Sequence, residues 1–174
     1  MKTSNAKFLN KLALITAVAF AAGTGVSAQA AEATSNLGIS ASVSANCSIK
    51  TTQALSFGGY NHISTNASNP LESTGKVEVA CTTGSTNPSI SIGQGGSYDT
   101  TNATRRLTDG TNFLAYKLYQ DGSYTTEWSN GAGNEVAATA DGSFVEYIVY
   151  GRIGPNQNVP VGNYSDNVLV TVTF

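Results

Sequence analysis

The chain lacks most of the residues that enzyme active sites depend on. It has a single histidine, His62, which lies in a loop rich in Asn and Ser. Any Ser-His-Asp triad would have to use it, and no nucleophile-elbow motif accompanies it. One histidine and two cysteines are also too few ligands for a zinc site. We therefore expect no catalytic residue, no metal site, no cofactor and no small-molecule substrate.

Apolar runs long enough to span a membrane are missing as well. The longest candidate, residues 12–22, has the length of a signal-peptide core and follows a basic segment. The lysines of that segment are Lys2, Lys7 and Lys11. We predict that residues 1–30 are a secretory signal peptide, cleaved after Ala30 or after Ala28. The alternative, an uncleaved membrane anchor, is disfavoured because the run is short.

Charged residues are few, and basic residues are the scarcer kind. Three of the nine basic residues lie in the predicted signal, so residues 31–174 carry six basic against eleven acidic residues, a net charge of about −5. This balance disfavours nucleic acid and anionic membranes as partners. Residues 31–174 suit one domain with a real core, exported through the Sec pathway.

Both cysteines of the chain, Cys47 and Cys81, lie in the exported part. Export favours a disulfide between them. It would close a loop of about 35 residues and contribute roughly 3–4 kcal/mol. Two buried free thiols are the alternative.

No segment of residues 31–174 has the periodicity of a helix. Short runs of alternating apolar residues recur instead, separated by turns that contain Gly, Asn or Pro. We expect strands at residues 37–43, 47–49, 55–60, 76–81, 89–92, 113–119, 144–153 and 168–174. The run 144–153 is apolar on both faces, which is typical of a central strand. The pattern predicts an all-β sandwich of about seven to eight antiparallel strands.

The closing run alternates most strictly. Four apolar residues share one face of the expected strand: Val168, Val170, Val172 and Phe174. Chain termini usually fray unless a sheet or a partner holds them. We therefore expect that another element buries this face.

Several features that resemble binding motifs have simpler interpretations. Four aspartates could suggest calcium: Asp99, Asp109, Asp121 and Asp141. They form no EF-hand ladder and three of them precede Gly, so we interpret them as turn residues. We interpret the doublet Arg105-Arg106 as a solvated turn and place Trp128 in a polar loop. The eight tyrosines are expected to be core or rim aromatics.

A set of motifs covers nearly all of the exported part in a fixed order. They are Cys47, Leu55-Ser56-Phe57-Gly58-Gly59-Tyr60, the segment 75–81, Leu114-Ala115-Tyr116-Lys117-Leu118-Tyr119, Trp128, Val149-Tyr150-Gly151-Arg152-Ile153, Gly162-Asn163-Tyr164-Ser165-Asp166 and the terminal Val-Thr-Val-Thr-Phe. Their order resembles the spore coat protein U family. It is similar as well to the major-subunit domain of archaic chaperone–usher pili, which belongs to the same family.

The resemblance implies an immunoglobulin-like, pilin-like sandwich that lacks its final strand. In pilus members of the family a periplasmic chaperone fills the gap, and the N-terminal segment of a neighbouring subunit later replaces it. Carried over to this chain, the donor strand lies in residues 33–44, with Leu37, Ile39, Ala41 and Val43 as the inserted side chains. The acceptor edge is then the face of Val168, Val170, Val172 and Phe174. The alternative makes residues 33–44 the first strand of their own domain.

We expect a structural protein rather than an enzyme, exported through the periplasm and assembled at the surface. It would be a spore coat component or a fibre subunit, and the alternative within the family is a subunit of an adhesive archaic chaperone–usher pilus. Its partners would be copies of itself or related coat or pilus subunits, a periplasmic chaperone and an outer-membrane usher. The hypothesis from another class is a secreted glycan-binding module that uses Trp128 and the tyrosines.

Overall fold

The computed structural model describes residues 30–174. Its contacts divide the chain after Ser40, and the fold described below is formed by residues 41–174. The predicted signal peptide lies, apart from Ala30, outside the described residues and stays a prediction. Within residues 30–174, no helix has the length and apolarity needed to cross a membrane.

The described part is all-β, with eight strands and one 3-10 turn, Thr65–Ala67. The strands are β1 (Cys47–Gln53), β2 (Leu71–Cys81), β3 (Ser89–Ile92), β4 (Arg105–Thr108), β5 (Phe113–Tyr119), β6 (Val136–Ala137), β7 (Val145–Ile153) and β8 (Val170–Thr173). All paired strands are antiparallel. The predicted fold class is confirmed.

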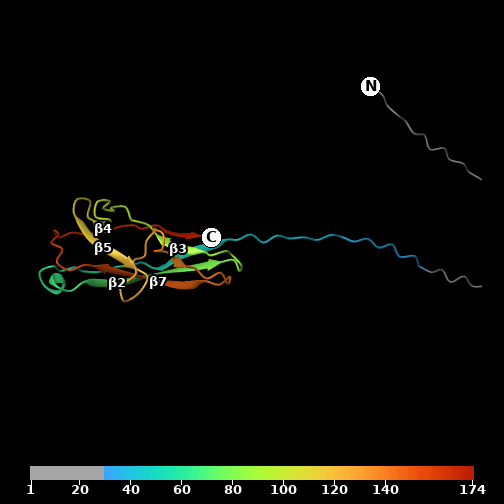
Figure 1. Ribbon diagram of the computed structural model, residues 1–174, viewed down its shortest axis with the longest axis horizontal. Coiled ribbons are helices and arrows are strands. Elements are labelled where there is room, and N and C mark those ends of the chain that lie inside the picture. The colour runs from blue at the N-terminus through green and yellow to red at the C-terminus, as the bar shows by residue number, and fades with distance from the viewer. Residues whose placement is uncertain (1–29) are drawn as a thin grey trace, which may run out of the picture. The chain divides into compact units, whose positions relative to one another are not determined.

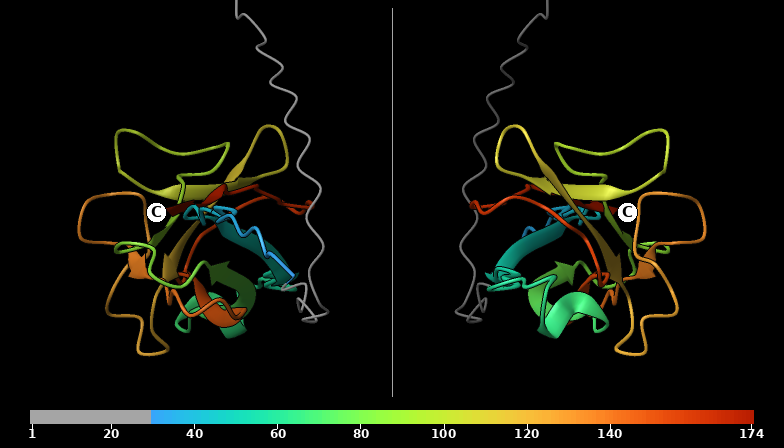
Figure 2. Two further views of the ribbon diagram at one scale, coloured as in Figure 1. Left: turned by 90° about the vertical axis from the view of Figure 1, so that its right-hand side faces the viewer. Right: turned by 90° about the vertical axis from the view of Figure 1, so that its left-hand side faces the viewer.

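The strands form two sheets that pack face to face as a sandwich (Figures 1 and 2). One sheet has five strands in the order β1-β2-β7-β5-β4, and the other has three in the order β6-β3-β8. β7 lies in the middle of the larger sheet, as its two-sided apolar pattern predicts. β8 lies at an edge of the smaller sheet and pairs with β3.

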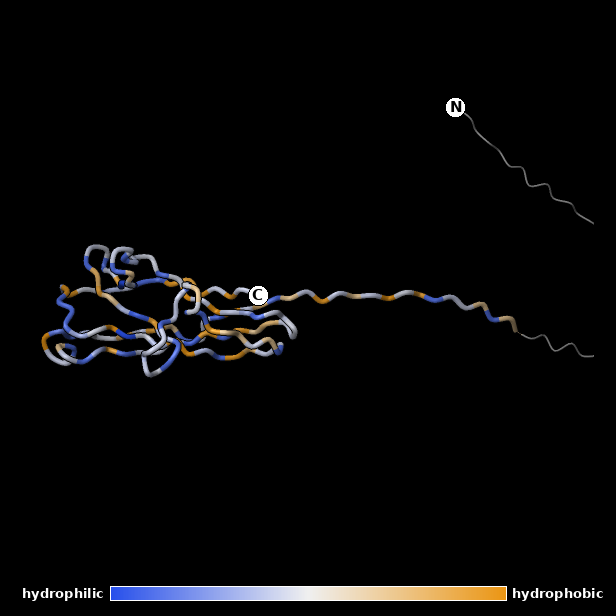
Figure 3. The backbone as a smooth tube through the Cα atoms, in the orientation of Figure 1, coloured by the Kyte–Doolittle hydropathy of each residue, from blue (hydrophilic) through white to orange (hydrophobic). Residues whose placement is uncertain are grey.

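The core lies between the two sheets and follows from the alternation of side chains along the strands. On β2, Val77, Val79 and Cys81 are buried while the residues between them are not. β3 and β5 alternate in the same way, and Figure 3 shows the resulting mixture of apolar and polar positions along the chain. The largest fully buried side chain is Trp128, which is 1% exposed and donates its indole N–H to the Ile90 carbonyl at 2.9 Å. Trp128 lies in the loop between β5 and β6, as predicted, but its ring is part of the buried core, so it is not available for the glycan binding that the sequence suggested.

The aspartates act as turn residues, as predicted. Asp109 accepts hydrogen bonds from the backbone N–H groups of Thr111 and Asn112, within the hairpin that joins β4 to β5. Asp99, Asp121 and Asp141 each accept at least one backbone N–H two residues further on. Side-chain oxygens used in this way stabilise the turn locally.

Two expected strands are absent from the described part of the chain. Residues 30–46 have no strand, and their side chains are exposed. Figure 3 shows the apolar positions that alternate through this segment. Residues 55–60 also form no strand and pack instead against the larger sheet. In both cases the alternation is present, but a strand also needs a hydrogen-bonding neighbour.

Candidate functional site: two open edges and a groove

The β8 strand has one edge without a partner among residues 30–174. Its other edge pairs with β3, where the Gly93 N–H donates to the Leu169 carbonyl at 2.8 Å. Hydrogen-bonded pairs alternate along an antiparallel ladder. The backbone groups of Thr171 and Thr173 therefore face β3, and those of Val170 and Val172 point to the open edge.

The β1 strand has an open edge too, at the border of the larger sheet. The Thr82 N–H donates to the Asn46 carbonyl at 2.9 Å, which sets the alternation of this ladder. The backbone groups of Cys47, Ile49 and Thr51 consequently point away from β2. β1 and β8 approach one another to within 8 Å between Cα atoms, so the two open edges lie on the same side of the sandwich.

A groove with a volume of about 920 Å³ continues from these edges. One wall is formed by residues 55–63, which follow β1, and the other by residues 159–166, which precede β8. Leu107, Leu114 and Ile153 from the larger sheet also line it. The groove is therefore apolar in its depth, while Ile63 and Val161, which line it too, are 81% and 104% exposed.

Two glycines allow the first wall to lie close to the sheet. A Cβ atom on Gly151 would stand 2.6 Å from Leu55 Cδ1 and 2.8 Å from Phe57 Cζ. A Cβ atom on Gly75 would stand 3.0 Å from Leu55 Cβ. A side chain at either position would force Leu55 or Phe57 to move, so glycine at both positions lets these two residues pack closely on the sheet.

The hydroxyl of Tyr60 links the first wall to residues 154–157, which come just before the second wall in the chain. It donates to the Gly154 carbonyl at 2.8 Å and accepts the Gln157 N–H at 2.9 Å. The side chain of Gln157 is itself held by both backbone groups of Ala115. This hydrogen bonding fixes the width of the groove at that end.

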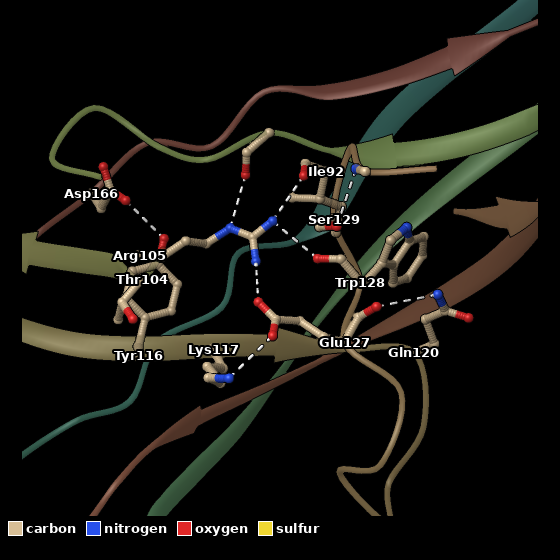
Figure 4. A network of polar contacts seen from close by, with 12 residues as sticks. Ile92, Thr104, Arg105, Tyr116, Lys117, Gln120, Glu127, Trp128, Ser129 and Asp166 are labelled. Carbon is tan, nitrogen blue, oxygen red and sulfur yellow. Dashed lines mark hydrogen bonds and ion pairs between the residues drawn. The ribbon is translucent and has the colours of Figure 1, made fainter. Parts of the chain in front are cut away.

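The second wall is held by a carboxylate, that of Asp166. It accepts a hydrogen bond from the Tyr116 hydroxyl at 2.8 Å (Figure 4). It also accepts one from the Gly96 N–H at 2.8 Å. Burial, reinforced by the hydrogen bond to Asp166, raises the pKa of Tyr116, so the phenol stays protonated and donates. Ser165 adds two backbone hydrogen bonds with Thr108. These hydrogen bonds hold the second wall in place, although it contains no long strand.

Arg105 stabilises the same region from within the sandwich. Its side chain is 2% exposed and donates to the carbonyls of Gly93, Ile92 and Trp128 at 2.8 to 3.0 Å (Figure 4). Its Nη1 also lies 3.6 Å from Glu127, which binds Lys117 through its other oxygen. Burial lowers the pKa of Arg105, but a guanidinium remains charged. The prediction of a solvated turn at Arg105-Arg106 is wrong, because the backbone pairs in β4 and directs Arg105 inward.

The predicted site residues have different outcomes. Cys47 and Cys81 form a disulfide between directly paired positions of β1 and β2, as predicted. Three residues of the proposed acceptor face, Val168, Val170 and Val172, are half-buried and contact the core, while Phe174 is 52% exposed. None of these four lines the groove itself.

Several residues of the groove were missed by the interpretation of the sequence. Leu55 and Phe57 alternate like strand residues, and only the fold shows that they form a wall. The signal that points to them is the pair of glycines inside otherwise regular strands, Gly75 in β2 and Gly151 in β7. His62 lines the groove and is half-buried. Among residues 30–174, no three His, Cys, Asp or Glu side chains gather as metal ligands would.

Comparisons with known proteins agree on the kind of fold. A family model described as the Spore Coat Protein U domain matches residues 33–171. "Protein U" of Myxococcus xanthus is 36% identical in an alignment over 159 residues, which covers 84% of this chain and 88% of that protein.

A solved structure matches as well, a chaperone–tip adhesion subunit pre-assembly complex from the archaic chaperone–usher Csu pili of Acinetobacter baumannii. The TM-score is 0.54 at 23% identity, over 76% of this chain and 40% of the solved chain. The present chain thus spans less than half the length of the solved one, and the likeness shows a pilin-like fold. Coat domains and pilus subunits are structural kinds of protein.

Proposed function

The chain belongs to the Spore Coat Protein U domain family, and on that premise we propose that it is an exported fibre subunit completed by a strand from a neighbouring molecule. The observation that carries the proposal is the pair of open edges, β1 and β8, beside a groove that is apolar in its depth. An added strand would satisfy the free backbone groups of an edge and place alternate side chains in the groove.

The proposed donor is the segment 33–44. Leu37, Ile39 and Val43 are 85%, 89% and 86% exposed, and with Ala41 they alternate as an inserted strand must. Burying a Leu, an Ile and a Val would each contribute about 1.5–3 kcal/mol. In a strand, the twelve residues of this segment would span about 40 Å.

The proposal includes a route to the surface. Residues 1–30 would direct export through the Sec pathway, and residues 31–174 would fold in the periplasm. A periplasmic chaperone would cover the open edge there, and an outer-membrane usher would exchange it for the donor strand of the next copy. The product would be a polymer at the cell surface that resists dissociation.

The test compares two substitutions at neighbouring positions of the donor. Ile39→Asp puts a charge on the face that would enter the groove, whereas Ser40→Asp puts the same charge on the opposite face. We expect that Ile39→Asp prevents polymerisation and leaves a monomer that folds when a chaperone or a peptide fills the groove. Ser40→Asp should polymerise, as measured by size-exclusion chromatography and electron microscopy.

Two results would contradict this proposal. One is wild-type protein that remains a stable monomer at high concentration without a chaperone. The other is an Ile39→Asp monomer that unfolds and that no added peptide restores to assembly, which would place residues 33–44 within their own domain.

A spore coat component is the second candidate function. It is favoured by the 36% identity to Protein U of Myxococcus xanthus over most of both chains. The two functions differ in genetic context: chaperone and usher genes beside this one favour a fibre, and expression confined to sporulation favours a coat. Electron microscopy of the surface of wild-type and deletion strains would show which structure is lost.

A further inference from the structure

Three tyrosines gather on the outer face of the five-stranded sheet, away from the core. Tyr119 on β5 and Tyr150 on β7 are directly paired in the ladder, and Tyr124 comes from the loop after β5. The Tyr124 ring lies 5.5 Å from that of Tyr119 and 6.3 Å from that of Tyr150, nearly perpendicular to both. We call these three residues the tyrosine cluster. All three are half-buried, so each ring keeps part of its surface in solvent.

The backbone at Tyr124 has a conformation that aromatic residues rarely adopt. Its φ is 56°, in the left-handed region, where Asn and Gly are more usual. The Asp121 carboxylate holds this loop by accepting the N–H groups of Ser123 and Thr126. Unusual backbone conformations are concentrated at ligand sites, where the surrounding structure maintains them. The loop thus holds an aromatic ring over the sheet at a conformational cost.

Charged groups surround the cluster, and each is paired with an opposite charge. The Arg152 guanidinium stacks on the Tyr124 ring at 4.9 Å and lies 3.3 Å from Glu72. Lys117, opposite Arg152 in the ladder, binds Glu127 at 3.2 Å. The face therefore offers hydrogen-bond donors and acceptors side by side without a large net charge.

A shallow cavity of about 340 Å³ adjoins Tyr119 on this face. Lys117, Arg152 and Gln157 contribute to its lining, and Ala115 lies beneath them. The Gln157 side chain is already fixed by its two hydrogen bonds to Ala115. The volume is within the range of small-molecule sites and suits a ligand of one or two rings.

We propose that the tyrosine cluster and this cavity bind an uncharged carbohydrate chain. A pyranose ring has C–H groups that pack on an aromatic face and hydroxyl groups that both donate and accept hydrogen bonds. Glu72 and Glu127 can accept from such hydroxyls, and Arg152 and Lys117 can donate to them.

Other ligands fit the face less well. An unbroken run of prolines has no N–H donors for the two glutamates, and an anionic polymer would meet two carboxylates beside the two cations. The site lies on the outer face of the sheet, whereas the groove opens between the sheets, so carbohydrate binding does not depend on how the groove is used.

The experiment measures retention of the full exported chain on beads of neutral cross-linked dextran and on cellulose. Carboxymethylated dextran beads and beads carrying a polyproline peptide serve as the other matrices. Tyr124→Asn removes a ring at a position where Asn adopts the backbone more easily than Tyr, so the fold is retained. Tyr119→Ala removes a second ring. The matched control is Phe113→Ala, because Phe113 is an exposed aromatic on the same strand that also carries a stacked arginine.

We expect retention on at least one neutral matrix, lowered about fivefold or more by Tyr124→Asn and by Tyr119→Ala and unchanged by Phe113→Ala. Thermal unfolding of each variant checks that the fold is kept. The proposal is overturned by no retention on either neutral matrix or by equal retention of all variants. Retention only on carboxymethylated or polyproline beads would overturn it as well, by assigning the face to a different ligand class.

Discussion

Arg105→Ala is expected to destabilise the protein far more than Arg106→Ala, although the two residues are neighbours on β4. The Arg105 side chain is 2% exposed and donates to three backbone carbonyls. Each buried acceptor that loses its donor costs about 1–3 kcal/mol. Water can enter the space left by the side chain, so we expect a total of about 3–5 kcal/mol. Glu127 is one-third exposed and adds little, because water can solvate it once the arginine is gone.

Arg106 makes a hydrogen bond to the Ser97 carbonyl, an ion pair with Asp99 and a stacking contact with Phe113, and its side chain is 26% exposed. Partly exposed contacts of these kinds contribute about 0–1 kcal/mol each, so we expect a total of about 1 kcal/mol. For a domain of this size, 1 kcal/mol corresponds to a shift in Tm of about 3–4 °C. Arg105→Ala should therefore lower Tm by about 9–20 °C, and Arg106→Ala by about 4 °C.

The assay is thermal unfolding of the full exported chain by circular dichroism, with all variants in the same assembly state. Arg105→Met keeps much of the side-chain volume and removes the donors, so it should be destabilised nearly as much as Arg105→Ala. Equal shifts for the two alanine variants, or a wild-type Tm for Arg105→Met, would refute the role assigned to these hydrogen bonds.

Three further predictions use simple measurements. Mass spectrometry of a non-reduced digest should find Cys47 linked to Cys81, and alkylation of both thiols without reduction would disprove the link. Replacing both residues by Ser should lower the free energy of unfolding by about 3–4 kcal/mol. Hydrogen bonds from Asn112, with those from the backbone, lower the pKa of Asp109 to about 2. The Asp109 carboxylate therefore stabilises the fold above pH 4, and this contribution is lost as the pH falls through 2. Asp109→Asn should flatten the acid limb of the stability curve, and an unchanged acid limb would contradict this. His62→Ala should leave assembly intact, and loss of assembly with the fold preserved would assign the groove-lining imidazole a role.

Local patterns predicted much of the fold because alternation and turn chemistry act over a few residues. The central place of β7, the Asx turns at the aspartates and the disulfide all follow from such short-range signals. The groove could not be predicted in this way. Its walls consist of residues 55–63 and 159–166, which lie about one hundred residues apart and form no strand over most of their length.

Arg105 and Trp128 show that the polarity of neighbouring residues does not predict whether a side chain is buried. An arginine doublet and a tryptophan between polar residues look like surface features. The side chains of Arg105 and Trp128 are nevertheless buried in the core. The Arg105 charge is accommodated because carbonyls from three positions converge on it, and that convergence depends on the tertiary fold. The alternation at residues 37–43 predicted a strand that the structure does not form, because strand formation depends on a partner edge.

Amide hydrogen exchange along β8, measured at single-residue resolution, tests most directly whether a neighbouring molecule completes the sandwich. Thr171 and Thr173 face β3, whereas Val170 and Val172 face the open edge. In the assembled wild-type protein, all four amides should exchange slowly. In the Ile39→Asp monomer without an added peptide, Val170 and Val172 should exchange fast, and a peptide with the sequence of residues 33–44 should slow their exchange. Equal exchange of Val170 and Val172 in the monomer and in the assembled protein would contradict completion of β8 by a donated strand.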